Sequence, residues 1–233
     1  RTKLLKFIDN KNIMLEIACF EITSAEIALQ SMADRIEFCH NIDAGGLTPD
    51  FYEFLHLKRT YKTPVYVMIR PSGGSFFYSD AEFILMKNSI ITFKEGGADG
   101  FVFGILNSNN EIDEAKNAEL LTLAGDIPCT FHRAFDRTEN LEKSIETLIR
   151  LGFKTVLTSG GKKSAVEGKE NLKKLIQKYA DKIEILIGGG VRSENIVELK
   201  EFTCGTSFHS SAITKYNTFV SESEIKKLKQ LSS

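Results

Sequence analysis

Short apolar runs alternate with longer segments of helical periodicity along almost the whole chain. Eight runs rich in β-branched, aromatic and aliphatic residues have the length of buried strands. They cover residues 15–20, 35–39, 65–70, 100–105, 129–133, 155–159, 183–187 and 204–209. Between them, apolar residues recur at helical spacing, as at Leu141, Ile145 and Leu148. The pattern therefore predicts eight strand–helix units.

The ends of the predicted helices carry local signals. Four polar residues stand where a side chain can accept the first free N–H groups of a helix, namely Thr23, Ser24, Asp80 and Ser193. Gly97 and Gly152 follow helical segments, as is typical of a helix that ends in a left-handed residue. We expect outer helices that include residues 51–60, 81–95 and 172–179.

Strict alternation of strand and helix implies a parallel sheet, because parallel neighbours need a crossover connection. Eight such units favour closure into an α/β fold of the (β/α)8 TIM-barrel-like type, as a single domain over residues 14–233. An open doubly wound sheet is the alternative, but it needs a Gly-x-Gly-x-x-Gly turn that is missing after the first run. We interpret residues 1–13 as a partly ordered N-terminal leader, since they lack the apolar core of a signal peptide.

Composition narrows the range of partners. The chain has 233 residues, is 42% hydrophobic and has a formal net charge of −1, so it provides no general field for nucleic acid. No apolar run approaches the twenty or so residues that span a bilayer. Four cysteines are scattered without zinc-type spacing: Cys19, Cys39, Cys129 and Cys204. We therefore expect a soluble cytoplasmic protein with reduced thiols and with neither a nucleic-acid nor a membrane partner.

Polar residues gather where the predicted strands end. In a barrel of this type the active face lies at the carboxyl ends of the strands, so charges there carry more weight than charges on helices. The period of two puts Arg35, Glu37 and Cys39 on one face of their strand, and Ile36 and Phe38 on the other. We expect the polar face to point into the barrel mouth.

These strand ends supply groups for proton transfer and for anion binding. The candidate catalytic residues are His132, Asp136 and Glu37. The candidate substrate-binding or anion-binding side chains are Glu16, Arg70, Arg133, Ser159 and His209. The alternative for the charged residues of the first two strands, including Arg35, is a closed network in which they only satisfy one another.

Two glycine-rich loops follow the sixth and seventh strands. The first contains Gly160 and Gly161, and the second contains Gly188, Gly189 and Gly190. Glycines let backbone N–H groups approach an anion, and a following helix N-terminus adds partial positive charge. These loops therefore favour a phosphate or another anion, although tight turns without a ligand also use glycine.

An ordered set of motifs resembles one known family. The matching segments are DRIEFC at 34–39, GGLTP at 45–49, MIRP at 68–71, YSD at 78–80, GADGFVFG at 97–104, TFHRAFD at 130–136, LTSG at 157–160 and GGG at 188–190. They resemble the CutC copper homeostasis proteins, from about residue 14 to about residue 212. The resemblance implies a TIM-barrel-like fold, a cytoplasmic location and a role in copper homeostasis that includes copper binding. We also expect a homo-oligomer.

The cysteines that the resemblance implies for copper binding are only partly present in this chain. The first strand of the family reads Glu-Val-Cys where this chain has Glu16, Ile17 and Ala18, and Cys19 is displaced by one position. One step along a strand reverses the face of a side chain. Cys39 matches the second family cysteine and is the candidate metal ligand, but a lone thiolate is a weak Cu(I) site. We therefore expect only weak copper binding.

Two functions remain open. The first is that of a CutC-like protein of copper homeostasis that binds copper. The second is that of a TIM-barrel enzyme or binding protein for a small anionic metabolite, for example a phosphorylated one, at the carboxyl mouth. Ala18 in place of the family cysteine favours the second function, and the sequence leaves open whether a reaction is catalysed.

Overall fold

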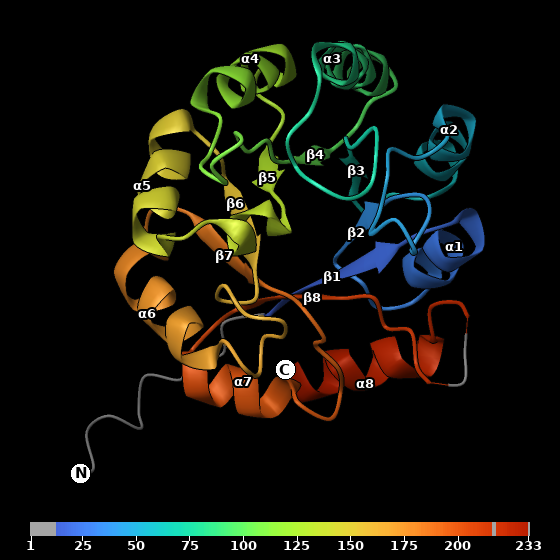
Figure 1. Ribbon diagram of the computed structural model, residues 1–233. Coiled ribbons are helices and arrows are strands. Elements are labelled where there is room, and N and C mark those ends of the chain that lie inside the picture. Colours follow the sequence, from blue (N-terminus) through green and yellow to red (C-terminus); the bar gives the residue numbers. More distant parts are fainter. Residues whose placement is uncertain (1–12, 216–217, 233) are drawn as a thin grey trace.

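The structure is a computed structural model that describes residues 13–215 and 218–232 (Figure 1). The predicted leader, apart from Ile13, lies outside the described residues. The strands are β1 (Met14–Cys19), β2 (Arg35–Phe38), β3 (Val65–Met68), β4 (Gly100–Phe103), β5 (Cys129–Phe131), β6 (Thr155–Thr158), β7 (Glu184–Ile187) and β8 (Ser207–Ser210). The helices are α1 (Ile22–Gln30), α2 (Phe51–Thr60), α3 (Asp80–Glu95), α4 (Glu114–Ala124), α5 (Leu141–Leu151), α6 (Lys169–Tyr179), α7 (Ile196–Thr203) and α8 (Glu222–Ser232), with a 3-10 helix η1 (Arg133–Arg137) after β5.

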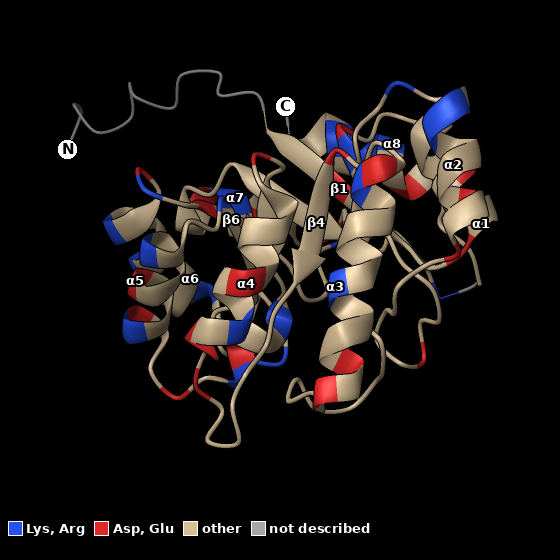
Figure 2. Ribbon diagram, turned by 90° about the horizontal axis from the view of Figure 1, so that it is seen from above, with Lys and Arg blue, Asp and Glu red and all other residues tan. Residues whose placement is uncertain are grey.

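The strands close into one parallel barrel in sequence order. β1 completes the ring by pairing with both β2 and β8, so that Glu16 lies opposite Arg35 on one side and His209 on the other. The α-helices surround the barrel (Figure 1), and basic and acidic residues are interspersed over them (Figure 2). The predicted (β/α)8 fold is confirmed, and the open-sheet alternative is excluded.

The helix starts follow the predicted chemistry only in part. Ser79 caps α3 through a capping box, so the cap precedes the predicted Asp80 by one residue. The cap of α1 is Glu21, whose carboxylate accepts hydrogen bonds from the N–H groups of Thr23 and Ser24. The two residues predicted as caps are therefore the donors that the cap satisfies.

The segment from the end of β7 to the start of β8 departs furthest from the prediction. Ser193 does not cap α7; its N–H and hydroxyl donate to Glu224 of α8 at 2.7 and 2.8 Å. Cys204 ends α7 in the left-handed conformation, with φ 60°, so it is not part of a strand. β8 begins at Ser207, three residues later than its predicted start.

The alternation of side chains along the strands creates two interior layers. Outward-facing apolar side chains form the large core between the barrel and the helices. Inside the barrel, Cys39, Tyr66, Met68 and Val102 form a second, small apolar cluster. The remaining interior is polar, which leaves charged groups buried beneath the carboxyl mouth. Within the described ranges, no helix is both long and apolar enough to cross a bilayer.

Candidate functional site

A cavity of about 230 Å³ opens at the carboxyl ends of the strands. It is lined by Ala18, Phe20, Glu37, Gly45, Met68, Arg70, Phe76, His132, Arg133, Leu157, Gly189, Gly190, Arg192, His209, Ser210 and Ser211. Seven residues predicted from the sequence are brought together here: Glu37, Arg70, His132, Arg133, Gly189, Gly190 and His209. The other predicted residues, Glu16, Cys39, Asp136, Ser159 and Gly188, do not line this cavity.

Glu16 is fully buried and joins two other strands through its carboxylate. Arg35 Nε donates to Glu16 Oε2 at 2.5 Å, and His209 Nδ1 lies 2.7 Å from Glu16 Oε1. Burial alone would raise the pKa of Glu16, but the charge of Arg35 and the contact with His209 lower it to about 2. Glu16 therefore stays ionised and orients His209. Its contacts with Arg35 and His209 agree with the closed network that is the alternative for the first two strands.

Glu37 lies beside this network but is not closed by it. Its Oε1 accepts a hydrogen bond from the Cys39 thiol at 3.2 Å, whereas its buried Oε2 has no partner in the described part of the chain. Burial raises the pKa of Glu37, although His209 opposes this shift. For His209 the balance is reversed: burial would lower its pKa, but the carboxylates Glu37 and Glu16 raise it. The open carboxyl oxygen makes Glu37 available to a ligand.

His132 caps η1 and faces the cavity. Its Nδ1 accepts a hydrogen bond from the N–H of Ala134 at 3.3 Å, while its buried Nε2 has no partner within residues 13–215 and 218–232. Burial and the neighbouring charge of Arg70 lower the pKa of His132 to about 3. The ring is therefore neutral near pH 7, and because Nδ1 is an acceptor, Nε2 carries the proton. His132 presents an uncharged N–H donor to the mouth.

Arg70 is a buried cation that has no carboxylate partner among the described residues. Its Nη1 donates to the carbonyl oxygens of Ala44 and Gly46 at 2.8 and 3.1 Å, and its Nε has no acceptor. The ring of Phe76 covers the guanidinium at 4.9 Å. Backbone carbonyls thus fix the position of Arg70 without neutralising its charge.

Arg133 and Asp136 hold the loop after β6. Asp136 accepts hydrogen bonds from Arg133 Nε at 2.8 Å, from Thr158 Oγ1 at 2.5 Å and from the N–H groups of Ser159 and Gly161 at 3.1 and 2.9 Å. Its carboxylate is therefore occupied by donors of this chain. These contacts assign Asp136 to positioning Arg133 and the loop, while its predicted role in proton transfer stays a prediction.

The glycine loops reach the mouth by backbone geometry. Gly189 and Gly190 have φ values of 94° and 81°, which favour glycine. A Cβ at Gly189 would lie 2.9 Å from the Cβ of Ser159 and 3.3 Å from the guanidinium carbon of Arg133. The N–H of Gly188 is taken by the Thr158 carbonyl at 3.0 Å. α7 starts only at Ile196 and α6 only at Lys169, so the expected helix N-termini do not follow the loops directly.

Arg192 is a site residue that sequence reasoning missed. It lines the cavity, and its Nη1 and Nη2 donate to Ser210 Oγ and Ser211 Oγ at 3.1 and 2.8 Å. Burial lowers its pKa, although Glu224 opposes this shift. In the sequence, the only indication of its role is its position just after the glycines of the loop. That it faces the mouth becomes visible only in the structure, where β8 pairs with β7.

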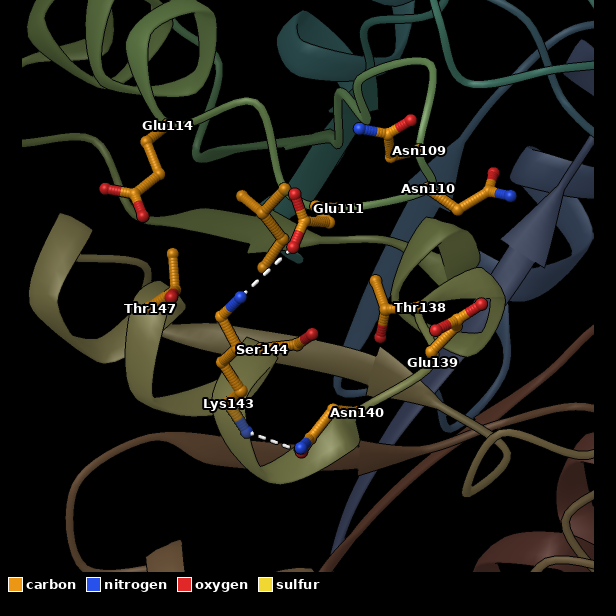
Figure 3. Close-up of a pocket in the computed structure, with 11 residues that line it drawn as sticks. Asn109, Asn110, Glu111, Glu114, Thr138, Glu139, Asn140, Lys143, Ser144 and Thr147 are labelled. Atoms are coloured by element: carbon orange, nitrogen blue, oxygen red, sulfur yellow. Dashed lines mark hydrogen bonds and ion pairs between the residues drawn. The ribbon is translucent and has the colours of Figure 1, made fainter.

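Two larger hollows lie elsewhere on the surface, one adjoining this cavity and one separate from it. A rim hollow of about 990 Å³ shares Arg70 and Arg133 with the mouth and adds Lys162 and Lys163. A separate hollow of about 690 Å³ lies beside the starts of α4 and α5 (Figure 3). Its polar side chains bond to one another, as Lys143 Nζ does with Glu111 Oε1 at 3.0 Å (Figure 3). No residue predicted from the sequence as a site lines this second hollow.

The comparisons with known proteins agree with the sequence motifs. The model of the CutC family matches residues 13–214. A copper homeostasis protein cutC homolog of Homo sapiens is 41% identical over 199 residues, which are 85% of this chain and 73% of the relative. A family protein CutC of Photorhabdus laumondii is 41% identical over 198 residues, covering 85% of this chain and 79% of the relative.

Solved structures show the same fold. The crystal structure of CutC from Streptococcus agalactiae superposes with a TM-score of 0.82 at 33% identity, covering 87% of this chain and 100% of that one. A thiamine phosphate pyrophosphorylase from Pyrococcus furiosus superposes with a TM-score of 0.63 at 16% identity, covering 94% and 95% of the two chains. At that low identity the likeness shows the fold alone.

Proposed function

We propose that this chain, which belongs to the CutC family, binds a small anionic ligand at the carboxyl mouth of its barrel. The observation that carries the proposal is the buried guanidinium of Arg70, which lacks a carboxylate partner and has an open Nε. Keeping an arginine buried without a counter-ion is costly, and a bound anion removes that cost. Arg70 is therefore the centre of the proposed site.

The other lining groups support the same charge of ligand. Arg133 and Arg192 add two further guanidinium groups, whereas Glu37 is the only carboxylate among the described residues that line the cavity. Burial raises the pKa of Glu37, a shift in the direction that favours an anion nearby. Phosphate and carboxylate are the groups that arginine forks bind best. A cavity of about 230 Å³ suits a phosphorylated or carboxylated metabolite of a few carbon atoms.

The predicted catalytic residues fit this ligand unequally. Glu37 and His132 both line the cavity, and each has a buried polar atom without a hydrogen-bond partner among the described residues, so both are candidates to contact the ligand. Asp136 supports the site from behind through Arg133. Whether Glu37 and His132 transfer a proton or only orient the ligand is decided by a turnover assay once the ligand is known.

Copper handling is the second function that we propose, because relatives in Homo sapiens and Mus musculus are named copper homeostasis proteins. The residues present do not fit a Cu(I) site of two thiolates. Cys39 is one buried thiol near the mouth, and Ala18 stands where the second thiol is expected. Cys19 belongs to the outer core, where its thiol contacts the carbonyl oxygens of Ile17 and Ser24. A contribution to copper homeostasis therefore does not run through a dithiolate at this mouth.

The remaining proposals concern the state of the chain. We propose a cytoplasmic homo-oligomer, supported by four free cysteines and by the exposed apolar side chains Ile84, Leu85 and Ile91 on α3. Light scattering of the purified chain tests the oligomer, and a monomer at all concentrations would contradict it.

The anion site is tested by titrating inorganic phosphate into the chain by calorimetry and by measuring Arg70→Lys and Arg70→Met. Lysine keeps the charge and loses the fork, so we expect phosphate affinity to fall by about tenfold for Arg70→Lys and by about a hundredfold for Arg70→Met. Arg150→Met is the matched control, because Arg150 is an exposed arginine paired with Glu114 on the helical surface. Equal affinity in all four proteins, or no binding at all, would refute the proposal.

A further inference from the structure

The floor of the mouth carries a second group of side chains, distinct in charge from the arginine wall. Glu16, Glu37 and His209 each place one donor atom so that the three atoms lie within 4.8 Å of one another. They come from β1, β2 and β8, which are neighbouring strands of the closed barrel. The barrel register therefore builds this group from rigid elements.

We infer that Glu16, Glu37 and His209 bind one divalent first-row transition-metal ion. This site goes beyond the proposed anion site and does not depend on it. It uses the carboxylates and the imidazole of the floor, whereas the anion site uses the arginines of the wall.

The open oxygen of Glu37 is the observation that points to a ligand. Glu37 is 3% exposed, and its Oε2 has no hydrogen-bond partner among the described residues. A purely structural network would satisfy this atom, because a buried carboxyl oxygen without a partner costs free energy. A cation at this position satisfies it and adds two strong contacts, to Glu16 and His209.

The charges already present allow an ion to enter. Arg35 pairs with Glu16 through Oε2, so the second oxygen, Oε1, faces His209, and an ion would replace the contact of 2.7 Å between Oε1 and His209 Nδ1. In the form that binds metal, with both carboxylates ionised, His209 neutral and Arg35 charged, the group has a formal charge of −1, so the ion competes with protons at Glu37 and His209. The contact of Arg35 behind Glu16 resembles the outer hydrogen bonds that orient carboxylate ligands in metal sites.

The donor types select the class of metal. One imidazole nitrogen and two carboxylate oxygens suit a borderline ion such as Zn²⁺ or Co²⁺, whereas Cu(I) prefers thiolates and Ca²⁺ prefers a larger set of oxygens. Bonds of about 2.0–2.2 Å place neighbouring ligands about 3.0–3.5 Å apart. Donor atoms that lie within 4.8 Å of one another therefore reach a common ion through side-chain rotations that move each atom by about an ångström.

The test is equilibrium dialysis of the full chain against Zn²⁺ with elemental analysis, together with the absorption spectrum of added Co²⁺. We expect one Zn²⁺ per chain, and a loss of affinity of at least tenfold in both Glu37→Gln and His209→Ala. The matched control is His56→Ala, because His56 is an exposed histidine that lies 3.1 Å from a carboxylate oxygen of Glu26. This control should bind Zn²⁺ as the unaltered chain does.

Three results would overturn the inference. They are no stoichiometric ion in the unaltered chain, unchanged binding in both site variants, or an equal loss in His56→Ala. Thermal unfolding of each variant shows whether it is folded, and the two site variants provide independent readings. Loss of phosphate binding with retained Zn²⁺ binding in Arg70→Met separates this site from the anion site, and phosphate binding by the unaltered chain without any Zn²⁺ refutes only the metal.

Discussion

Replacing His132 with asparagine should change how the stability of the chain depends on pH. Asparagine is a strong helix cap, and its side-chain oxygen can accept the N–H of Ala134 that Nδ1 of His132 accepts in the structure. The substitution thus keeps the cap of η1 and removes the titrating ring. It also removes ring contacts with Phe76 and Phe131, whose centroids lie 4.8 and 6.0 Å away.

The sign of the effect follows from the lowered pKa of His132. Burial and Arg70 lower it from 6.5 to about 3, so the folded chain binds fewer protons than the unfolded chain between these values. Stability from this residue is complete above pH 6.5 and falls as the pH drops toward 3. Each pH unit in this window costs about 1.4 kcal/mol, so the loss at pH 5 is about 2 kcal/mol.

Plotted against pH, the stability of the asparagine variant should therefore cross that of the unaltered chain. At pH 8 it lacks the aromatic contacts and should be about 1–3 kcal/mol less stable. The difference should shrink by about 2 kcal/mol at pH 5, because only the unaltered chain pays the cost of charging His132. Glu16, Glu37 and His209 titrate in both proteins and largely cancel in the comparison.

Urea unfolding of both proteins at pH 8, 6.5, 5 and 4 measures this difference. The buffers should contain no phosphate or sulfate, since an anion beside His132 would favour its charged form. Parallel stability curves, or a difference that widens at low pH, would show that His132 is not a neutral buried residue.

Two further substitutions test the surroundings of the mouth. Asp136→Asn replaces a carboxylate that accepts several hydrogen bonds with an amide that also donates, and it should lower the free energy of unfolding by about 3 kcal/mol. Asp126→Asn, at an exposed position, is the control and should lower it by less than about 0.5 kcal/mol. Similar values for the two variants would contradict the role of Asp136 in holding the loop. Ala18→Cys should tighten Cu(I) binding at least tenfold in a competition titration with a chelator, because it adds a second thiol at the mouth. Tight binding by the unaltered chain that survives Cys39→Ser would contradict the reasoning about residue 18.

The sequence predicts the barrel well because its evidence is periodic. The period of two along β2 placed Arg35 and Glu37 inside the barrel, and the structure buries both there. Eight strand–helix units then leave few ways to close the sheet. The predicted start of the last strand was wrong because Cys204 adopts a left-handed conformation that residues other than glycine and asparagine seldom take.

The side chains of the site are harder to predict because their roles depend on neighbours in other strands. Asp136 belongs to a motif that ends a strand, yet its carboxylate is taken by β6 and the loop that follows it. Arg192 carries no sequence signal beyond the preceding glycines, and it reaches the mouth because Ser210 and Ser211 of the last unit hold it there. Such contacts are set by closure of the barrel and not by local pattern.

The two proposed sites share one cavity, so their ligands should influence each other. A divalent ion on Glu16, Glu37 and His209 would add positive charge to the cavity that Arg70 also lines. Phosphate should then bind more tightly in the presence of Zn²⁺, and linkage requires that phosphate tighten Zn²⁺ by the same factor, which is expected to be about 5- to 100-fold. Calorimetric titration of phosphate with and without Zn²⁺, paired with Zn²⁺ dialysis with and without phosphate, measures both sides of this cycle. Glu37→Gln should abolish the coupling, so that phosphate binds this variant equally with and without Zn²⁺. Independent binding of the two ligands would mean that they do not meet in this mouth, because two opposite charges within a buried cavity of about 230 Å³ cannot be indifferent to each other.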